Sequence, residues 1–379
     1  MKYRKLGKTN LTVSEIGLGC EHIDRKPYSQ VKETIDAALR HNVNIFDCFM
    51  PGTEIREHIA KALGSKRKDV IIQGGIGSTD LKQQYDFSRD LTIVKKYFED
   101  LLRIFGYIDI GMLFFVDSEK DFSDVFETEF LDYAQSLKQK GDIRHIGISS
   151  HNPITAKRAL ETGIPEVLFF SLNPVFDMLP PEEDAVGQMF SEFNTSLMQG
   201  IDPVRSELYK LCEKQNVGIT VMKTVCGGKL ISAEHTPFSK PMTVPQCIHY
   251  ALTRPAVASA LLGCQTEAEV EETMTYYSVT DEERDYSEIL SSKCNQFTGN
   301  CVYCNHCQPC PSEIDIAAVM KYLDIARLTP NAVPSSIKAH YQNLPANAAT
   351  CTNCGSCETR CPFNVQIMNN MTEANRIFA

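Results

Sequence analysis

The sequence has no long apolar segment and no excess of basic residues. None of its 379 residues belongs to an apolar run long enough to cross a bilayer. The basic start of the chain is not followed by the apolar stretch of a signal peptide. The formal net charge of −10 argues against nucleic acid or an anionic membrane as the main partner. We therefore expect a cytoplasmic protein whose partners are small molecules or other proteins.

Cysteine, in contrast, is abundant. Eight of the fifteen cysteines form two runs, each closed by a proline: Cys301-x2-Cys304-x2-Cys307-x2-Cys310-Pro311 and Cys351-x2-Cys354-x2-Cys357-x3-Cys361-Pro362. The Cys-Pro ending is typical of bacterial two-cluster ferredoxins, in which the fourth cysteine of each run binds the cluster of the other run. We therefore predict two [4Fe–4S] clusters ligated by these eight cysteines.

Zinc and disulfides are the alternatives for these thiols. Two complete quartets that end in Cys-Pro fit zinc poorly, and disulfides are disfavoured because no signal peptide is expected. The first run has two residues before Cys310 where the ferredoxin pattern has three, so the partner of Cys310 is left open. Unpaired thiols together with oxygen-sensitive clusters indicate a reducing, anaerobic cytoplasm. The seven cysteines outside the runs are Cys20, Cys48, Cys212, Cys226, Cys247, Cys264 and Cys294.

The first 280 residues alternate short apolar runs with amphipathic helical stretches. We expect strands at residues 14–19, 43–47, 70–73, 108–115, 145–149, 167–171, 218–222 and 258–262. We expect helices at 29–41, 53–63, 90–105, 126–139, 154–162, 206–215, 244–253 and 267–277, with Ser29, Thr53 and Asn152 as caps. Eight strands that are each followed by a helix predict an α/β fold, the (β/α)8 TIM barrel. A hairpin over residues 3–13 is expected to cap the barrel floor.

Two features depart from this alternation. Some thirty residues separate Asn173 from the helix at 206, which predicts a lid or binding loop at the C-terminal face, or else a loop that packs on its own Met and Phe residues. From residue 281 the composition changes. We therefore expect a barrel over 1–280 and a small α-helical, two-cluster ferredoxin-like domain over 281–379, with a helix at 314–328 between the two cysteine runs.

Six segments spread over the barrel carry a family resemblance: MKYRKLGKTNLTVSEIGLG, NVNIFDC, GDIRHIGISSHN, LNPVFD, VMKTVCGGKL and LLGCQTEAEVEE. In this order they resemble the aldo-keto reductases, and with the cysteine runs the whole chain resembles the iron–sulfur branch of that family. The resemblance implies a (β/α)8 fold and NADPH-dependent carbonyl reduction. In that reaction a Tyr donates the proton, a Lys perturbs the Tyr, an Asp pairs with the Lys, and a His orients the carbonyl.

Three of these four catalytic residues are missing from the sequence. Asp47 occupies the Asp position, but residues 48–52 contain no Tyr. Gly75 stands where the Lys is expected, and Phe114 or Phe115 stands where the His is expected. The usual Tyr-based reaction is therefore not expected of this barrel.

The positions that would hold a nicotinamide cofactor are altered as well. Ser149 matches the residue that holds the nicotinamide carboxamide, but its usual Asn neighbour is Ser150. Asn173 and Gly263, after the sixth and eighth strands, are the other candidate cofactor-binding residues. Residues 263–272, where the family binds the 2′-phosphate of NADPH, contain four Glu and no Lys or Arg. Carboxylates repel a phosphate, so NADPH is disfavoured, and NADH or another ligand remains open.

Reactive side chains remain at the C-terminal ends of the strands, which face one mouth. We single out Asp47, Lys223 and His151 as candidate acid–base residues. Lys223 is either a replacement cation that pairs with Asp47 or a structural lysine, and His151 is either a general acid or a solvated, helix-capping residue. The remaining candidates are thiols that bind a metal or react with substrate, unless they are small core residues, and tyrosines that replace the missing one: Cys20, Cys48, Cys226, Cys264, Tyr28 and Tyr85.

The leading functional hypothesis is a redox enzyme. Electrons would pass through the two clusters to or from a small organic substrate or an unexpected cofactor in the barrel mouth, with a ferredoxin or flavoprotein as the external redox partner. One alternative is an NAD(P)H-dependent carbonyl reductase with accessory clusters. Another is a non-catalytic electron-transfer subunit that keeps the barrel as a scaffold, and a fourth is a lyase or hydratase. The substrate, the direction of electron flow and the oligomeric state are left open.

Overall fold

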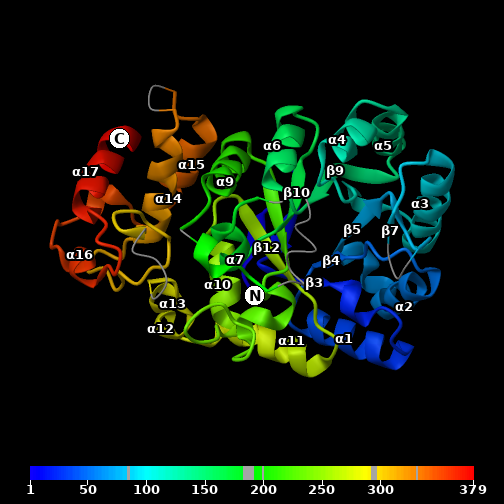
Figure 1. Ribbon diagram of the computed structural model, residues 1–379, viewed down its shortest axis with the longest axis horizontal. Coiled ribbons are helices and arrows are strands. Elements are labelled where there is room, and N and C mark those ends of the chain that lie inside the picture. The colour runs from blue at the N-terminus through cyan, green and yellow to red at the C-terminus, as the bar shows by residue number, and fades with distance from the viewer. Residues whose placement is uncertain (83–85, 182–191, 199, 292–296, 330–331) are drawn as a thin grey trace.

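Eight parallel strands close into a barrel in the order β10-β11-β12-β3-β4-β5-β8-β9 (Figure 1). The computed structural model describes residues 1–82, 86–181, 192–198, 200–291, 297–329 and 332–379. The barrel strands are β3 Ile16–Gly19, β4 Ile45–Asp47, β5 Ile71–Ile76, β8 Ile108–Leu113, β9 Ile143–Ser150, β10 Val167–Ser171, β11 Gly218–Met222 and β12 Val257–Leu262. The predicted (β/α)8 fold is confirmed, and β10 and β11 have the predicted bounds.

Helices cover the outside of the barrel, as Figure 1 shows. They are α1 Tyr28–Arg40, α2 Thr53–Leu63, α3 Leu91–Phe105, α4 Glu119–Phe126, α5 Glu129–Lys140, α6 Pro153–Glu161, α7 Pro174–Met178, α9 Pro203–Gln215, α10 Val244–Thr253 and α11 Glu267–Met274. The helix expected to begin at residue 126 is instead two helices. Phe126 ends α4, and α5 begins after Thr128, whose side chain accepts a hydrogen bond from the N–H of Phe130. The sequence pattern did not predict that one helix ends and the next begins here.

Of the three expected helix caps, one is confirmed. The Asn152 side chain accepts a hydrogen bond from the N–H of Ile154, 2.9 Å away, and caps α6. The prediction for Ser29 was wrong, because α1 begins one residue earlier and has no side-chain cap. Thr53 was also wrong as a cap: it is the first residue of α2, and its hydroxyl donates to Asp100 at 3.0 Å.

The barrel interior is packed by pairing small residues with large ones. A Cβ on Gly147 of β9 would lie 2.3 Å from the sulfur of Met112 on β8, so glycine makes room for this methionine. The floor is closed by the predicted hairpin, in which β1 Tyr3–Lys5 pairs antiparallel with β2 Thr12–Ser14. At Gly7, with φ +54°, a Cβ would lie 2.3 Å from the backbone nitrogen of Gly218, so the hairpin packs directly on the start of β11.

The C-terminal helices lie along one flank of the barrel, beside α9 and α10 (Figure 1). They are α12 Asp281–Arg284, α13 Ser287–Ser291, α14 Ile316–Arg327, α15 Ser335–Gln342, α16 Ser356–Arg360 and α17 Ile367–Phe378. The helix expected at 314–328 is α14. Across the contact with α9, His340 of α15 lies 3.0 Å from the carboxylate of Glu213.

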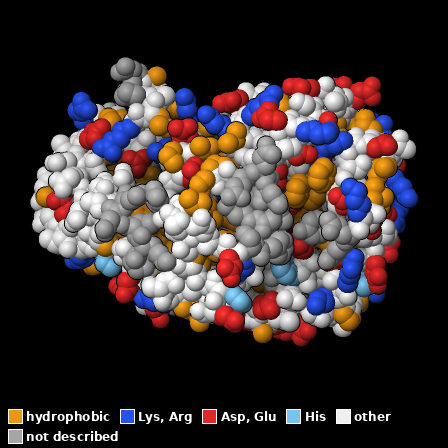
Figure 2. All heavy atoms as spheres, viewed as in Figure 1, with side chains coloured by type: hydrophobic (Ala, Val, Ile, Leu, Met, Phe, Trp, Pro, Cys, Tyr) orange, Lys and Arg blue, Asp and Glu red, His pale blue; other side chains and the backbone are white. Residues whose placement is uncertain are grey.

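Part of the long connection after β10 is described, as α7 and a short 3-10 turn at Thr195–Leu197. The remainder of the predicted lid, 182–191 and 199, lies outside the described residues, as do Tyr85 and Cys294. The following helix, α9, begins at Pro203 rather than 206, because Asp202 caps it. Acidic and basic side chains are interspersed over the face seen in Figure 2. Among the described residues, no helix is both long and apolar enough to cross a membrane.

Candidate functional site

Asp47 ends β4 at the barrel mouth, where it is only 3% exposed. Its carboxylate accepts a hydrogen bond from the side-chain amide of Gln73 on β5 at 3.1 Å, and the Gln73 carbonyl accepts one from Thr220 on β11 at 3.0 Å. Burial raises the pKa of Asp47 to about 8, although the Gln73 hydrogen bond acts in the opposite direction. Asp47 is therefore held by a buried chain of hydrogen bonds from uncharged side chains rather than by a cation.

Because the pKa of Asp47 is raised, we expect the stability of the fold to depend on pH. Between about pH 4 and pH 8 the unfolded chain has lost the Asp47 proton while the folded chain keeps it, so Asp47 lowers stability progressively as the pH rises. We expect Asp47→Asn to flatten this fall in the free energy of unfolding, as measured by urea denaturation at several values between pH 5 and pH 9. Equal pH slopes for the variant and the wild type would contradict the assignment.

Lys223 follows β11 in the left-handed backbone region, with φ 61°. Burial lowers the pKa of its ammonium group, and Glu21 is the carboxylate that opposes this most strongly. No ion pair within 4 Å joins Lys223 to Asp47, although the structure describes both residues. The expected replacement of the missing cation by Lys223 is therefore not formed.

His151, after β9, is buried and bound to Asp117, which follows β8. Its Nδ1 lies 2.7 Å from one carboxylate oxygen of Asp117, and its backbone N–H donates to the other at 2.6 Å. Burial acts to raise the pKa of Asp117, but His151 outweighs it and holds that pKa below its ordinary value. The interpretation of His151 as a solvated or capping residue was wrong, since Asn152 provides the cap. The pair can hold or transfer a proton at the imidazole.

Phenylalanine rings fill the positions from which the catalytic residues are missing. A Cβ on Gly75 would lie 3.1 Å from the ring of Phe114, which stacks on Phe49 with centroids 5.2 Å apart. The neighbouring Phe115 stacks on Phe87 at 5.3 Å and lies 5.1 Å from the His151 ring. A side chain at position 75 would therefore crowd the Phe114 ring, and this aromatic cluster occupies the region where the family's Lys and His are expected.

The candidate cofactor-binding residues already have partners. The Ser149 hydroxyl oxygen accepts the N–H of Phe115 at 2.9 Å. Asn173 accepts two backbone N–H groups of α7, both at 3.0 Å, and donates to the carbonyl of Lys223 at 2.9 Å. A Cβ on Gly263 would lie 2.2 Å from the His22 ring, so this glycine makes room for histidine. Their role toward a nicotinamide stays a prediction.

The other candidate residues do not form one group: Cys20 and Cys48 contact each other, whereas Cys264 and Tyr28 each contact other residues. The sulfurs of Cys20 and Cys48 lie 3.9 Å apart in the core, and the hydrogen bond from Cys48 is the largest cause that raises the pKa of Cys20. Cys264 lies 3.5 Å from the Thr273 hydroxyl. Tyr28 begins α1, where its ring packs against Lys61. Within the described ranges, no three His, Cys, Asp or Glu side chains are arranged to hold a single metal ion.

Two neighbouring cavities bring the eight run cysteines together, and each cavity draws on both runs. The first cavity is lined by Cys301, Cys304, Cys307 and Cys361. The second is lined by Cys310, Cys351, Cys354 and Cys357. Ile316 of α14 lines both. The fourth cysteine of each run thus joins the first three of the other, which supplies the partners of Cys310 that the sequence left open.

The two cavities differ in exposure. In the first, Cys304 and Cys307 are buried, whereas in the second Cys354 is exposed. Burial raises the pKa of Cys304 to about 12, so ionisation of that thiol needs a compensating positive charge. Val302 of the first cavity contacts Arg254 of the barrel, whereas the second cavity includes the exposed Cys354.

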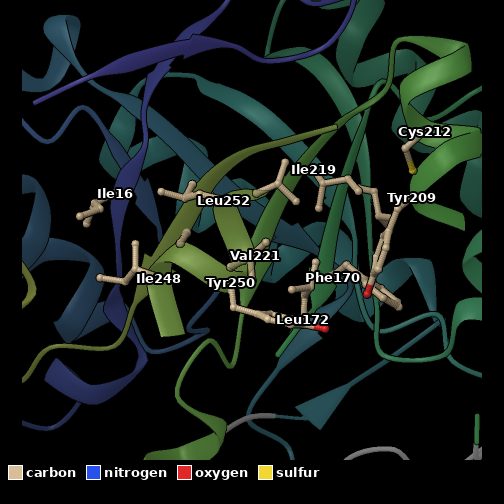
Figure 3. Packing of buried hydrophobic residues seen from close by; sticks show 14 of the residues in the cluster. Ile16, Phe170, Leu172, Tyr209, Cys212, Ile219, Val221, Ile248, Tyr250 and Leu252 are labelled. Carbon is tan, nitrogen blue, oxygen red and sulfur yellow. The ribbon is translucent and has the colours of Figure 1, made fainter. Parts of the chain in front are cut away.

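Sequence reasoning missed a buried polar network between the barrel strands and the outer helices. Asp177 of α7 is fully buried and accepts hydrogen bonds from the hydroxyls of Tyr209 at 2.5 Å and Tyr250 at 2.7 Å. Figure 3 shows these two tyrosines reaching toward the same region from α9 and α10. Arg205 lies 3.6 Å from Asp177 and donates to the carbonyl of His151 at 3.4 Å. The single acidic residue Asp177 in the otherwise apolar segment PVFDM of α7 was the available signal.

A wide recess lies at the barrel floor. It measures about 1660 Å³ and lies between the N-terminal hairpin and the C-terminal helices. Asn305, in the first cysteine run, lines both this recess and the first cavity. Open space next to the cysteines is therefore available on the floor side of the barrel.

Comparison with known proteins identifies the barrel. Residues 15–246, more than half of the chain, match the Aldo/keto reductase family. Over 304 residues the chain is 26% identical to L-galactose dehydrogenase of Arabidopsis thaliana, covering 72% of this chain and 86% of that protein. Over 191 residues it is 27% identical to the uncharacterized oxidoreductase YqkF of Bacillus subtilis, covering 48% of this chain and 59% of that protein.

A solved aldo-keto reductase from Bacillus halodurans, in its holo form, has the same fold. Its TM-score is 0.58 at 22% identity, with 76% of this chain and 96% of that one covered. The chain therefore belongs to the aldo/keto reductase family and is an oxidoreductase. The family match ends at residue 246, so both cysteine runs lie beyond it.

Proposed function

We propose that this oxidoreductase carries two [4Fe–4S] clusters, which pass single electrons between an external ferredoxin or flavoprotein and a small organic substrate or cofactor held by the barrel. The grouping of the cysteines carries the proposal. Each cavity is lined by four thiols, three from one run and one from the other, and four thiolates with the fourth exchanged between runs are the donor set of two-cluster ferredoxins. The residues present therefore fit the group.

The surroundings of the cavities suit this role. When bound, clusters of this type supply reversible one-electron transfer. Phe363 and Val365 line the first cavity, and Met368 and Met371 line the second, so apolar side chains cover part of each cavity. The second cavity, with the exposed Cys354, is the side open to a protein partner, and the first cavity is the one whose lining residue Val302 contacts Arg254 of the barrel.

The barrel mouth supports chemistry other than the usual Tyr-based reaction. The Phe114 ring lies against Gly75, and Asp47 has no lysine partner. His151, positioned by Asp117, is the group that can move a proton there. Electrons and protons would thus come from different parts of the molecule.

The test begins with protein purified without oxygen. We expect a brown protein with about eight iron atoms per chain, as two four-iron clusters require, and reduction of both clusters by reduced methyl viologen. Carbonyl reduction, assayed on a panel of aldehydes and ketones, should then need the one-electron donor. An NADPH-driven activity that persists after the iron has been removed would contradict the proposal.

A second candidate, the nicotinamide-dependent carbonyl reductase with accessory clusters, is favoured by the retained Asp47 and Ser149, both buried at strand ends. It predicts quenching of NADH or NADPH fluorescence on binding, and loss of NAD(P)H oxidation in Asp47→Ala. A barrel that takes up electrons but converts no substrate would instead indicate the non-catalytic subunit.

A further inference from the structure

Arg254 joins the barrel to the first cysteine run. It follows α10 and is only 2% exposed. One terminal nitrogen of its guanidinium donates to the carbonyl of Val302 and, at 2.9 Å, to the hydroxyl of Tyr286. Val302 lies between Cys301 and Cys304 and itself lines the first cavity. A buried cation thus contacts the loop between Cys301 and Cys304, two of the four cysteines that line the first cavity.

The remaining contacts of this cation are with aromatic rings rather than with a carboxylate. The guanidinium carbon lies 4.4 Å from the ring centroid of Tyr250 and 5.1 Å from that of Tyr303. Its Nε and second terminal nitrogen are buried without a hydrogen bond to any residue that the structure describes. No carboxylate of the described residues comes within 4 Å of the guanidinium. Burial acts to lower the pKa of Arg254, but Tyr286, Tyr250 and the more distant Asp177 hold that pKa above its ordinary value, so the guanidinium stays charged beside the first cavity.

At the second cavity the corresponding cation is exposed: Arg360 donates to the carbonyl of Pro309, which lines that cavity, at 2.8 Å. None of its lining residues is Lys or Arg, and Cys354 is exposed. Water therefore screens charge at the second cavity, whereas the surroundings of Arg254 are screened much less.

Taking the proposed function as its basis, we propose that Arg254 is the charge-compensating residue of the cluster at the first cavity and raises its reduction potential above that of the second. A cluster held by four thiolates is anionic, and reduction adds one further negative charge. A buried cation beside it stabilises the reduced form more than the oxidised form. Electrons that enter at the exposed second cavity are thereby drawn to the first cavity, next to the barrel.

The test is a redox titration of both clusters in the intact chain, followed by electron paramagnetic resonance. In Arg254→Gln we expect one midpoint potential to fall, with the reduced-to-oxidised ratio lowered at least tenfold, which is about 59 mV for one electron. The other potential should stay unchanged. Arg254→Lys keeps the charge and should recover most of the loss. If the glutamine variant does not fold, Arg254→Met, which buries no amide, carries the same expectation.

The matched control is Arg360→Gln. Arg360 also donates to carbonyls of the first run, to Cys307 at 3.2 Å and Pro309 at 2.8 Å, but it is exposed. Cys307 lines the first cavity and Pro309 the second, and because Arg360 is exposed we expect its removal to move either potential far less. Unchanged potentials in Arg254→Gln, or an equal fall of both, would overturn the role of Arg254. Wild-type protein without iron would instead overturn the proposed function, and the iron assay separates the two failures.

Discussion

Replacement of Cys301 and Cys361 together by serine should leave the protein with about half of its iron, as expected for one four-iron cluster of two. Both cysteines line the first cavity, so the double change disables that cavity alone. If each run instead bound its own cluster, the same double change would damage both clusters and remove nearly all the iron. Iron and acid-labile sulfide assays, with spectra of the reduced protein, distinguish these outcomes.

In the matched control, one of the two substitutions lies in the second cavity instead of the first. Cys301→Ser combined with Cys310→Ser alters two cysteines of a single run, but these line different cavities. We expect this variant to lose both clusters. Cys247→Ser, a buried cysteine outside the runs, should keep all its iron. Equal iron in the two double variants would contradict the exchange of the fourth cysteine.

Asp177→Ala should lower the free energy of unfolding by about 3–5 kcal/mol, the range for removing one partner from a buried charged network. Asp177 is fully buried, and its carboxylate is the acceptor for Tyr209 and Tyr250, with Arg205 3.6 Å away. Without it, two hydroxyls and a guanidinium remain buried without this acceptor. Urea denaturation under anaerobic conditions measures the loss.

Two control variants define the effect. Asp177→Asn keeps one oxygen acceptor and nearly the same volume, so we expect it to lose less than half as much stability. Glu288→Ala breaks the exposed pair with Lys240, in which the Glu288 side chain is 82% exposed, and should leave the urea midpoint unchanged. A loss in Asp177→Ala no larger than in Glu288→Ala would show that the network does not stabilise the fold.

The sequence predicted the barrel well because hydrophobic periodicity is a local property. Strands that are buried on both faces, such as β10 (VLFFS) and β11 (GITVM), appear as short, mostly apolar runs, and their bounds were correct. Helix starts were less reliable, because a cap depends on the geometry of one residue. Thr53 has the right chemistry for a cap, but its hydroxyl bonds Asp100 of another helix instead.

The contacts of the candidate site depend on closure of the barrel, which spacing along the chain does not encode. Asp47, Gln73 and Thr220 come from three different strands, and only the closed barrel brings the last of them to the first two. The same holds for Arg254, which meets Val302 only after the C-terminal helices have packed on α10. The cysteine runs were recognisable because the ligands of such clusters follow one another at short, fixed spacings along the chain.

The exchange of cysteines between the two runs has a consequence for how the protein is made. Cys361 completes the first cavity, and Cys351 begins the group that the second cavity needs. A chain that has been synthesised only as far as residue 350 therefore possesses neither cavity, although the barrel and the whole first run have already been made. Both cavities are completed within residues 351–361, so any metal they receive must be delivered after both runs have been synthesised.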